Sequence, residues 1–165
     1  MSVVVSLRGG LAHLAAMAAA MPAAEERAMT LACALVRDEA RQAIGHTEGG
    51  AGPFDAWPPL AAATQAQRVR EGFAPDAPLL RDGSLRDSIR MVVTRSAGVI
   101  EGIVGSASEI AVYQELGTAR IPPRSFLGVA AVQVADAVVA ALGRGVVDGL
   151  SDHRTRMNRR GEPSA

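Results

Sequence analysis

At positions 113–127 the chain reads Tyr-Gln-Glu-Leu-Gly-Thr-Ala-Arg-Ile-Pro-Pro-Arg-Ser-Phe-Leu. The adjacent Pro122 and Pro123 fix their φ angles and carry no N–H group, so the segment cannot lie inside a helix or a central strand. The residue before each proline is expected to be extended, and Gly117 is expected to take a backbone angle that other residues resist. The stretch therefore predicts a rigid loop that leads into the element after it.

That next element is an apolar helix, predicted from Phe126 to about Leu142 with Ser125 as its N-cap. Apolar side chains recur along it at helical spacing, at Leu127, Ala130, Val134, Val138 and Ala141, and Val132 and Val139 widen the stripe. A helix that is apolar nearly all round is buried on more than one side. In a chain of 165 residues, this pattern indicates contacts between subunits.

The N-terminal part predicts a short strand and two helices. Residues 2–7 are rich in β-branched side chains, which favours a strand, and a first helix is expected to reach about Met21. Pro22 ends that helix or begins the next one at a first-turn position, and Gly45 is the expected C-cap of the second helix. The second helix carries one apolar stripe, formed by Met29, Cys33, Val36, Ala40 and Ile44.

Residues 45–60 are rich in glycine and proline and form a segment too long for a simple connection. The segment carries the single tryptophan, Trp57, which anchors it either to its own core or to a partner. A short polar helix is predicted within 61–72. We interpret 45–82 as an extended insert within one domain that covers residues 1–150.

A β-hairpin is predicted next. A helical turn capped by Ser84 is expected first, and two strand-like runs follow it at 89–95 and 99–104. The Ala97-Gly98 pair between the runs supplies the turn. Residues 110–113 are expected to extend or border this sheet.

The amino-acid composition argues against most kinds of catalysis and cofactor binding. The formal net charge is zero, so no overall field attracts nucleic acid or an acidic membrane. All 17 basic residues are arginine, which excludes a Walker-type phosphate-binding lysine and a Schiff-base lysine. Ser, His and Asp form no recognisable nucleophile arrangement, and His46 with Glu48 lacks a third metal ligand. We therefore predict no enzymatic activity, no cofactor and no metal.

Three separated segments match, in order, the pattern of one protein family. The first is Trp57-Pro58-Pro59-Leu60 with Thr64, the second contains Leu80, Gly83, Leu85, Ser88 and Ile89, and the third contains Tyr113, Gly117, Ile121, Pro122, Pro123, Arg124, Phe126 and Leu127. The end of the predicted hairpin, Val104-Gly105-Ser106, also looks like the family's strand before the tyrosine. Over about residues 1–145, this combination resembles the tail-completion and head–tail joining proteins of long-tailed phages, also called virion morphogenesis proteins. The polar, Pro-containing stretch between Leu60 and Gly83 and the basic C-terminal tail depart from the pattern.

The resemblance implies an α+β fold with a small antiparallel sheet, here packed with two N-terminal helices, one long C-terminal helix and the Gly/Pro-rich loop. It also implies a structural role in the virion without catalysis, after assembly in the host cytoplasm. The expected assembly is a homo-oligomeric ring, with a hexamer favoured, that contacts other neck, tail-terminator or tail-tube proteins. No membrane partner is expected, because no run reaches the ~20 apolar residues of a membrane span.

Two features leave alternatives open. Arg124 either pairs with a carboxylate of a neighbouring subunit or caps loop carbonyls of its own subunit. Residues 151–165 are polar and basic, and they are expected to form a disordered tail. The arginines of this tail touch DNA passively in a neck channel, or they make the chain a nucleic-acid-binding accessory protein; they are Arg154, Arg156, Arg159 and Arg160.

Overall fold

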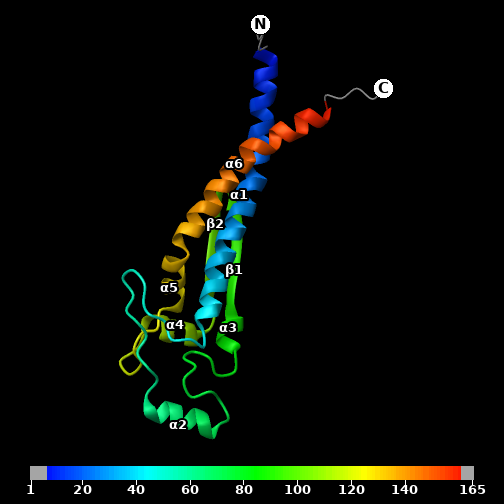
Figure 1. Ribbon diagram of the computed structural model, residues 1–165. Helices are drawn as coiled ribbons and strands as arrows, with labels where there is room; N and C mark the ends of the chain where they lie inside the picture. Colours follow the sequence, from blue (N-terminus) through cyan, green and yellow to red (C-terminus); the bar gives the residue numbers. More distant parts are fainter. Residues whose placement is uncertain (1–6, 161–165) are drawn as a thin grey trace.

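The computed structural model describes residues 7–160, which form an α+β fold (Figure 1). The helices are α1 (Leu7–Ala43), α2 (Ala62–Arg70), α3 (Ser84–Ser88), α4 (Glu109–Leu116), α5 (Phe126–Gln133) and α6 (Ala135–Arg160), and the strands are β1 (Ile89–Ser96) and β2 (Val99–Ser106). Helix α1 is the central element, with the hairpin packed along one side of it and α5 and α6 along another (Figure 1). The predicted fold class is confirmed.

The two predicted N-terminal helices are one continuous helix. Pro22 lies inside α1, so the predicted break at this residue is wrong. Proline removes the hydrogen bond to the carbonyl four residues earlier, but Ala18 and Pro22 are both exposed and water can satisfy that carbonyl. The carbonyl of Pro22 accepts a hydrogen bond from Arg95 at 2.8 Å, which ties this turn to the hairpin. The strand predicted at 2–7 lies outside the described residues, except that Leu7 begins α1.

The apolar stripe predicted for the second helix is present in the C-terminal half of α1. Cys33, Ala40 and Ile44 are buried, and this face turns toward the core. Gly45 follows the helix with φ of +101°, where a Cβ would lie 2.9 Å from Cδ2 of Leu80. The expected glycine at the helix end is therefore confirmed, because the backbone angle and the close side chain both favour it.

Strands β1 and β2 form the predicted antiparallel hairpin, and Ile89 pairs with Ser106 at its open end. Ala97 and Gly98 have φ angles of +49° and +83°. Left-handed angles at both central positions are those of a type I′ turn, whose twist matches that of the strands. The hairpin could therefore be predicted from local sequence alone.

Close packing of the hairpin on α1 depends on a glycine in β2. A Cβ added at Gly102 would overlap the sulfur of Cys33 and lie 2.8 Å from the sulfur of Met29. Any larger residue at this position would push α1 away from the sheet. The hairpin can therefore pack closely on α1 because Gly102 has no side chain.

Residues 110–113 are helical, so the expectation that they extend or border the sheet is wrong. They lie in α4, whose Ala111 is buried and whose C-cap is Gly117. The β-branched Ile110 and Val112 favour a strand locally. Two features outweigh that preference: the small Ala111 side chain is buried in the core, and Gly117 ends the helix.

The predicted C-terminal helix is divided in two. Helices α5 and α6 meet at Val134 with a bend of 58°. Phe126 at the start of α5 is fully buried, whereas α6 packs along α1. A single straight helix cannot satisfy both contacts. Helix α6 continues to Arg160, and residues 161–165 lie outside the described part.

The core lies where the C-terminal end of α1 meets α3, β1, α4 and α5. Ile89, Phe126 and Val129 are its largest fully buried side chains. Ile89 and Phe126 belong to one buried apolar cluster whose other members are Ala40, Ala43, Ile44, Trp57, Leu85, Ala111 and Ala130. Large-to-small substitution at such positions removes apolar contacts and leaves a cavity.

Candidate assembly site

Many of the residues predicted from the family pattern belong to the core. Trp57, Leu85, Ile89 and Phe126 are members of the buried cluster, and Leu80 and Leu127 pack against it. Trp57 is only 3% exposed, so of the two alternatives for this residue the structure shows the anchor to its own core. These side chains support the fold of their own subunit.

The loop after α4 closes through its own backbone. The N–H of Thr118 donates to the carbonyl of Ile121 at 2.8 Å, and the Thr118 hydroxyl accepts from the N–H of Ile121 at 3.1 Å. Gly117 has φ of +73°, and a Cβ there would lie 2.9 Å from the backbone nitrogen of Pro123. The special backbone angle predicted at Gly117 is confirmed. Tyr113, on the preceding helix, is exposed.

Glu115 links this loop to the start of α5, a role that the sequence analysis did not predict. Its Oε2 accepts from the N–H of Leu127 at 2.9 Å, and its Oε1 accepts from the N–H of Gly128 at 2.8 Å. A carboxylate at a helix N-terminus satisfies free N–H groups and complements the helix dipole. Sequence patterns for helix capping involve residues within a few positions of the helix end, whereas Glu115 lies 12 residues before Leu127.

Ser125 occupies the predicted N-cap position without the predicted capping bond. Its hydroxyl makes no cap hydrogen bond and donates instead to the carbonyl of Glu115 at 2.9 Å. Similarly, Ser84 is the first residue of α3, and Gly83 holds the cap position with φ of +85°. The Ser84 hydroxyl donates to Asp82 at 2.6 Å. The predicted N-cap position of Ser125 is therefore confirmed, whereas the predicted cap at Ser84 is wrong.

Arg124 joins two of the three family-like segments within one chain. It is 6% exposed, and its Nη2 donates to the carbonyls of Pro58 at 3.0 Å and Pro59 at 3.5 Å. Burial lowers the pKa of the Arg124 guanidinium, and the positive charge of Arg68 lowers it further. Of the two alternatives for Arg124, the structure shows the one in which it caps loop carbonyls of its own subunit.

Ser88 links α3 to the end of the hairpin. Its hydroxyl donates to the carbonyl of Leu85 at 2.6 Å and lies 2.7 Å from the hydroxyl of Ser106. This pair closes the base of the hairpin next to the fully buried Ile89. The role of Ser88 is thus to position β1 and β2.

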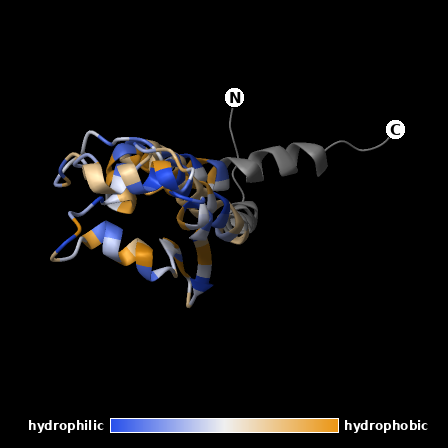
Figure 2. Ribbon diagram, turned by 90° about the horizontal axis from the view of Figure 1, so that it is seen from below, coloured by the Kyte–Doolittle hydropathy of each residue, from blue (hydrophilic) through white to orange (hydrophobic). Residues whose placement is uncertain are grey.

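Four further family-like residues line an open cleft of about 830 Å³, and Pro123 is not among its lining. They are Leu60, Thr64, Ile121 and Pro122, joined by Leu85 and Arg124 from the groups above. One wall belongs to residues 59–73, which we call the α2 arm. Figure 1 places α2 apart from the other helices, at the end of the molecule from which Figure 2 is seen, and none of its residues is buried.

Helix α6 is apolar on two opposite faces. On one face, Gly145 and Gly149 lie against α1, where added Cβ atoms would meet Ala28 and Met21. The opposite face carries exposed apolar side chains at helical spacing, which we call the α6 outer stripe: Val139, Val146, Val147 and Leu150. Of the residues predicted to widen the apolar stripe of the C-terminal helix, Val132 and Val139 are both exposed in the single chain.

The hairpin also exposes apolar side chains to solvent, on a face that carries Arg90, Thr94 and Glu101 as well. Val92 and Ile103 pair across the strands and are 55% and 56% exposed, and Val99 near the turn is 67% exposed. We call these three residues the hairpin outer face. Helix α1 meets the hairpin through Met29 and Cys33 and meets α6 through Met21 and Ala28. The hairpin and α6 therefore pack on different faces of α1.

Within the part of the chain that the structure describes, no group of three or more His, Cys, Asp or Glu side chains could hold a metal ion. Glu48 instead accepts a hydrogen bond from Gln133 at 3.3 Å. No single described helix is long and apolar enough to cross a membrane, although the bent pair Phe126–Gln133 and Ala135–Leu150 passes together by length and composition. The side chains of Arg154, Arg156, Arg159 and Arg160 lie outside the described part.

No family model, curated protein or solved structure matches this chain.

Proposed function

We propose that the chain is a non-enzymatic structural subunit that assembles into a ring at the head–tail junction of a long-tailed phage, as a tail-completion or joining protein. The sequence resemblance supplies the biological setting of this proposal. The observation that carries it is the α6 outer stripe, an apolar face on a helix whose opposite face is already packed against α1. Isolated exposed apolar residues are ordinary, whereas an aligned set on one helix face is typical of an interaction surface.

The size of the outer stripe fits a weak contact that is reinforced by ring closure. From Val139 to Leu150 a helix rises by about 16 Å. Full burial of one such side chain stabilises by about 1.5–3 kcal/mol, so four half-exposed side chains contribute roughly 3–6 kcal/mol before the entropic cost of association. An isolated pair of subunits would therefore be weak, and a closed ring with further virion partners would be stable.

A ring needs two different surfaces on each subunit, because a head-to-tail contact repeats and closes on rotation. The α6 outer stripe and the hairpin outer face are two such surfaces on different sides of α1. In the described residues, β1 and β2 pair only with each other, so each strand keeps one free edge. A strand or extended segment from a neighbour can pair with such an edge.

The decisive experiment is deletion of this gene from its source phage or prophage, followed by electron microscopy of the lysate. We expect full heads and unattached tails, restored to joined particles by the wild-type gene. Normal infectious particles after deletion would refute the proposed function.

Complementation with a variant of the outer stripe tests the surface itself. Val139→Asp places a charge on a side chain that is 68% exposed, so the subunit should fold while joining fails. Ala137→Asp adds the same charge at an exposed position of the same helix, away from the stripe, and should complement. Circular dichroism of both variants establishes that each is folded.

A further inference from the structure

The cleft beside the α2 arm has apolar walls. Leu60 and Phe73 from the arm face Leu79, Leu85, Ile110 and Ile121 from the rest of the chain. Its volume of about 830 Å³ lies within the range of sites that enclose a small ligand or a few residues of a peptide. The cleft is also open along one side, so an extended segment can enter it.

Positive charge gathers in the same cleft. Four arginines line it, Arg68, Arg81, Arg120 and Arg124, against one carboxylate, Asp82. Asp82 is engaged by the N–H and hydroxyl of Ser84 at 2.9 and 2.6 Å. The lining therefore has a clear excess of cationic groups.

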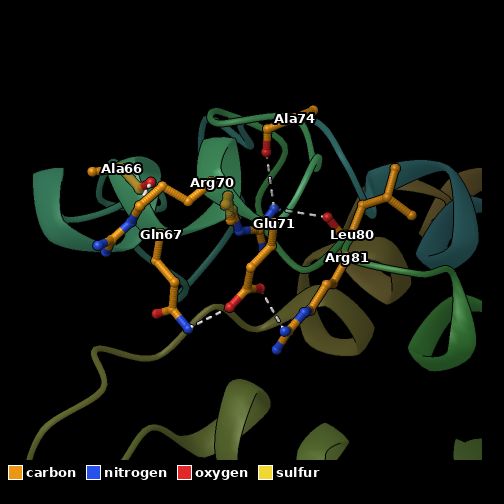
Figure 3. Close-up of polar contacts among 8 residues, drawn as sticks. Ala66, Gln67, Arg70, Glu71, Ala74, Leu80 and Arg81 are labelled. Atoms are coloured by element: carbon orange, nitrogen blue, oxygen red, sulfur yellow. Dashed lines mark hydrogen bonds and ion pairs between the residues drawn. The ribbon is translucent and has the colours of Figure 1, made fainter.

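Only one of these arginines has a carboxylate partner among the described residues. Arg81 pairs with Glu71 at 2.6 Å, and Gln67 holds the other oxygen of Glu71 (Figure 3). Arg68 instead donates to the backbone carbonyls of Ala77 and Leu80 at 2.8 and 2.7 Å. These carbonyls satisfy hydrogen bonds but leave the net charge of Arg68 uncompensated.

Two buried polar atoms of the lining lack partners. They are Nε of Arg124, a donor, and Oε1 of Gln114, an acceptor. A buried polar group without a hydrogen bond is costly, and in native proteins it usually marks a missing partner. Arg124 also lies near enough to Arg68 for the two positive charges to repel each other. An anion placed between them would relieve that repulsion.

We propose that this cleft binds a short peptide segment of a partner protein that carries a carboxylate flanked by aliphatic side chains. The carboxylate lies among the guanidinium groups of Arg68, Arg120 and Arg124, and the aliphatic side chains lie on the apolar walls. Inorganic phosphate or a nucleic-acid backbone would use the charge but not the apolar walls. The site is separate from the α6 outer stripe and does not depend on ring assembly.

The test is an NMR titration of the ¹⁵N-labelled full chain with the peptide Ac-Leu-Asp-Leu-NH₂ and its neutral counterpart Ac-Leu-Asn-Leu-NH₂. We expect the Asp peptide to shift the amide signals of residues 120–121 and 60–64, with a Kd on the order of 1 mM for so short a segment. The Asn peptide should bind about tenfold more weakly, since it lacks the charge.

Arg120→Gln is the informative variant, because Arg120 is exposed and its side chain makes none of the described hydrogen bonds or ion pairs. It should weaken the Asp peptide about three- to tenfold, while Arg144→Gln on α6 should leave the affinity unchanged. Equal binding of the two peptides, shifts confined to residues outside the cleft, or tighter binding of inorganic phosphate would each overturn the assignment. None of these outcomes affects the gene-deletion result, so the two proposals fail separately.

Discussion

Two glycines of α6, only two residues apart, should respond in opposite ways to the same substitution. An added Cβ at Gly145 would overlap the Cβ of Ala28 and lie 3.3 Å from the carbonyl oxygen of Ala24. At Gly143 an added Cβ meets nothing within 4 Å. The perturbation is therefore Gly145→Ala, with Gly143→Ala as its matched control.

The expected change in the free energy of unfolding has two contributions. Replacing a helical glycine with alanine stabilises by about 0.5–1 kcal/mol, because alanine loses less backbone entropy on folding. This gain is common to both variants and cancels in their difference. Overpacking a filled contact costs about 1–3 kcal/mol, and only Gly145 meets such a contact. Because the neighbours of Gly145 are a backbone oxygen and a methyl group, they cannot rotate aside and α6 must move away from α1.

Urea or thermal unfolding monitored by circular dichroism measures the difference. We expect Gly143→Ala to match or exceed the wild type, and Gly145→Ala to unfold about 2–12 °C below Gly143→Ala, given that 1 kcal/mol shifts Tm by about 2–4 °C at this chain length. Several protein concentrations are needed, because self-association also raises Tm. A Gly145→Ala variant as stable as Gly143→Ala would refute the close α1–α6 packing.

Three further predictions concern the core and the loops. Glu115→Ala removes the acceptor of two backbone N–H groups at the start of α5 and should destabilise by about 1–3 kcal/mol in denaturant titration, with Glu115→Gln intermediate because one neutral acceptor remains. Phe126→Ala empties a fully buried site and should cost about 3–5 kcal/mol; a loss below about 1 kcal/mol would place this ring outside the core. The hydroxyl and N–H of Ser84 hold the pKa of Asp82 below its ordinary value, so any stability from this carboxylate is present above its unfolded pKa and is lost as pH falls through the folded one. NMR titration should show the pKa of Asp82 rising toward its ordinary value in Ser84→Ala, and an unchanged pKa would contradict that cause.

Features encoded by neighbouring residues could be predicted from the sequence. The hairpin followed from two strand-like runs around Ala97-Gly98, and its turn has the expected left-handed angles. Gly45 and Gly117 were expected at positive φ and are found there. The short polar helix α2 was also expected. Each of these depends on steric limits of a few consecutive residues, which act in the same way in any fold.

Features fixed by contacts between distant residues could not be predicted in this way. Local sequence rules predict that a helix ends at Pro22, yet α1 continues through this residue. Ala18 and Pro22 are exposed to water, and Arg95 donates a hydrogen bond to the carbonyl of Pro22. β-Branched side chains favour a strand at 110–113, yet burial of Ala111 makes this segment a helix. The capping of α5 by Glu115 involves residues 12 and 13 positions away.

The features of the candidate sites also divide into those that local sequence predicts and those that tertiary contacts fix. The sequence by itself determined the turn positions and an apolar C-terminal helix with more apolar surface than one contact can bury, because hydrophobic period and backbone sterics are local properties. The α+β class was an expectation from the family resemblance. Only the tertiary structure decided which face of α6 stays exposed, that Trp57 and Arg124 serve their own subunit, and that arginines far apart in the chain share one cleft. Those outcomes depend on how segments separated in sequence pack together, and no spacing rule along one chain contains that information.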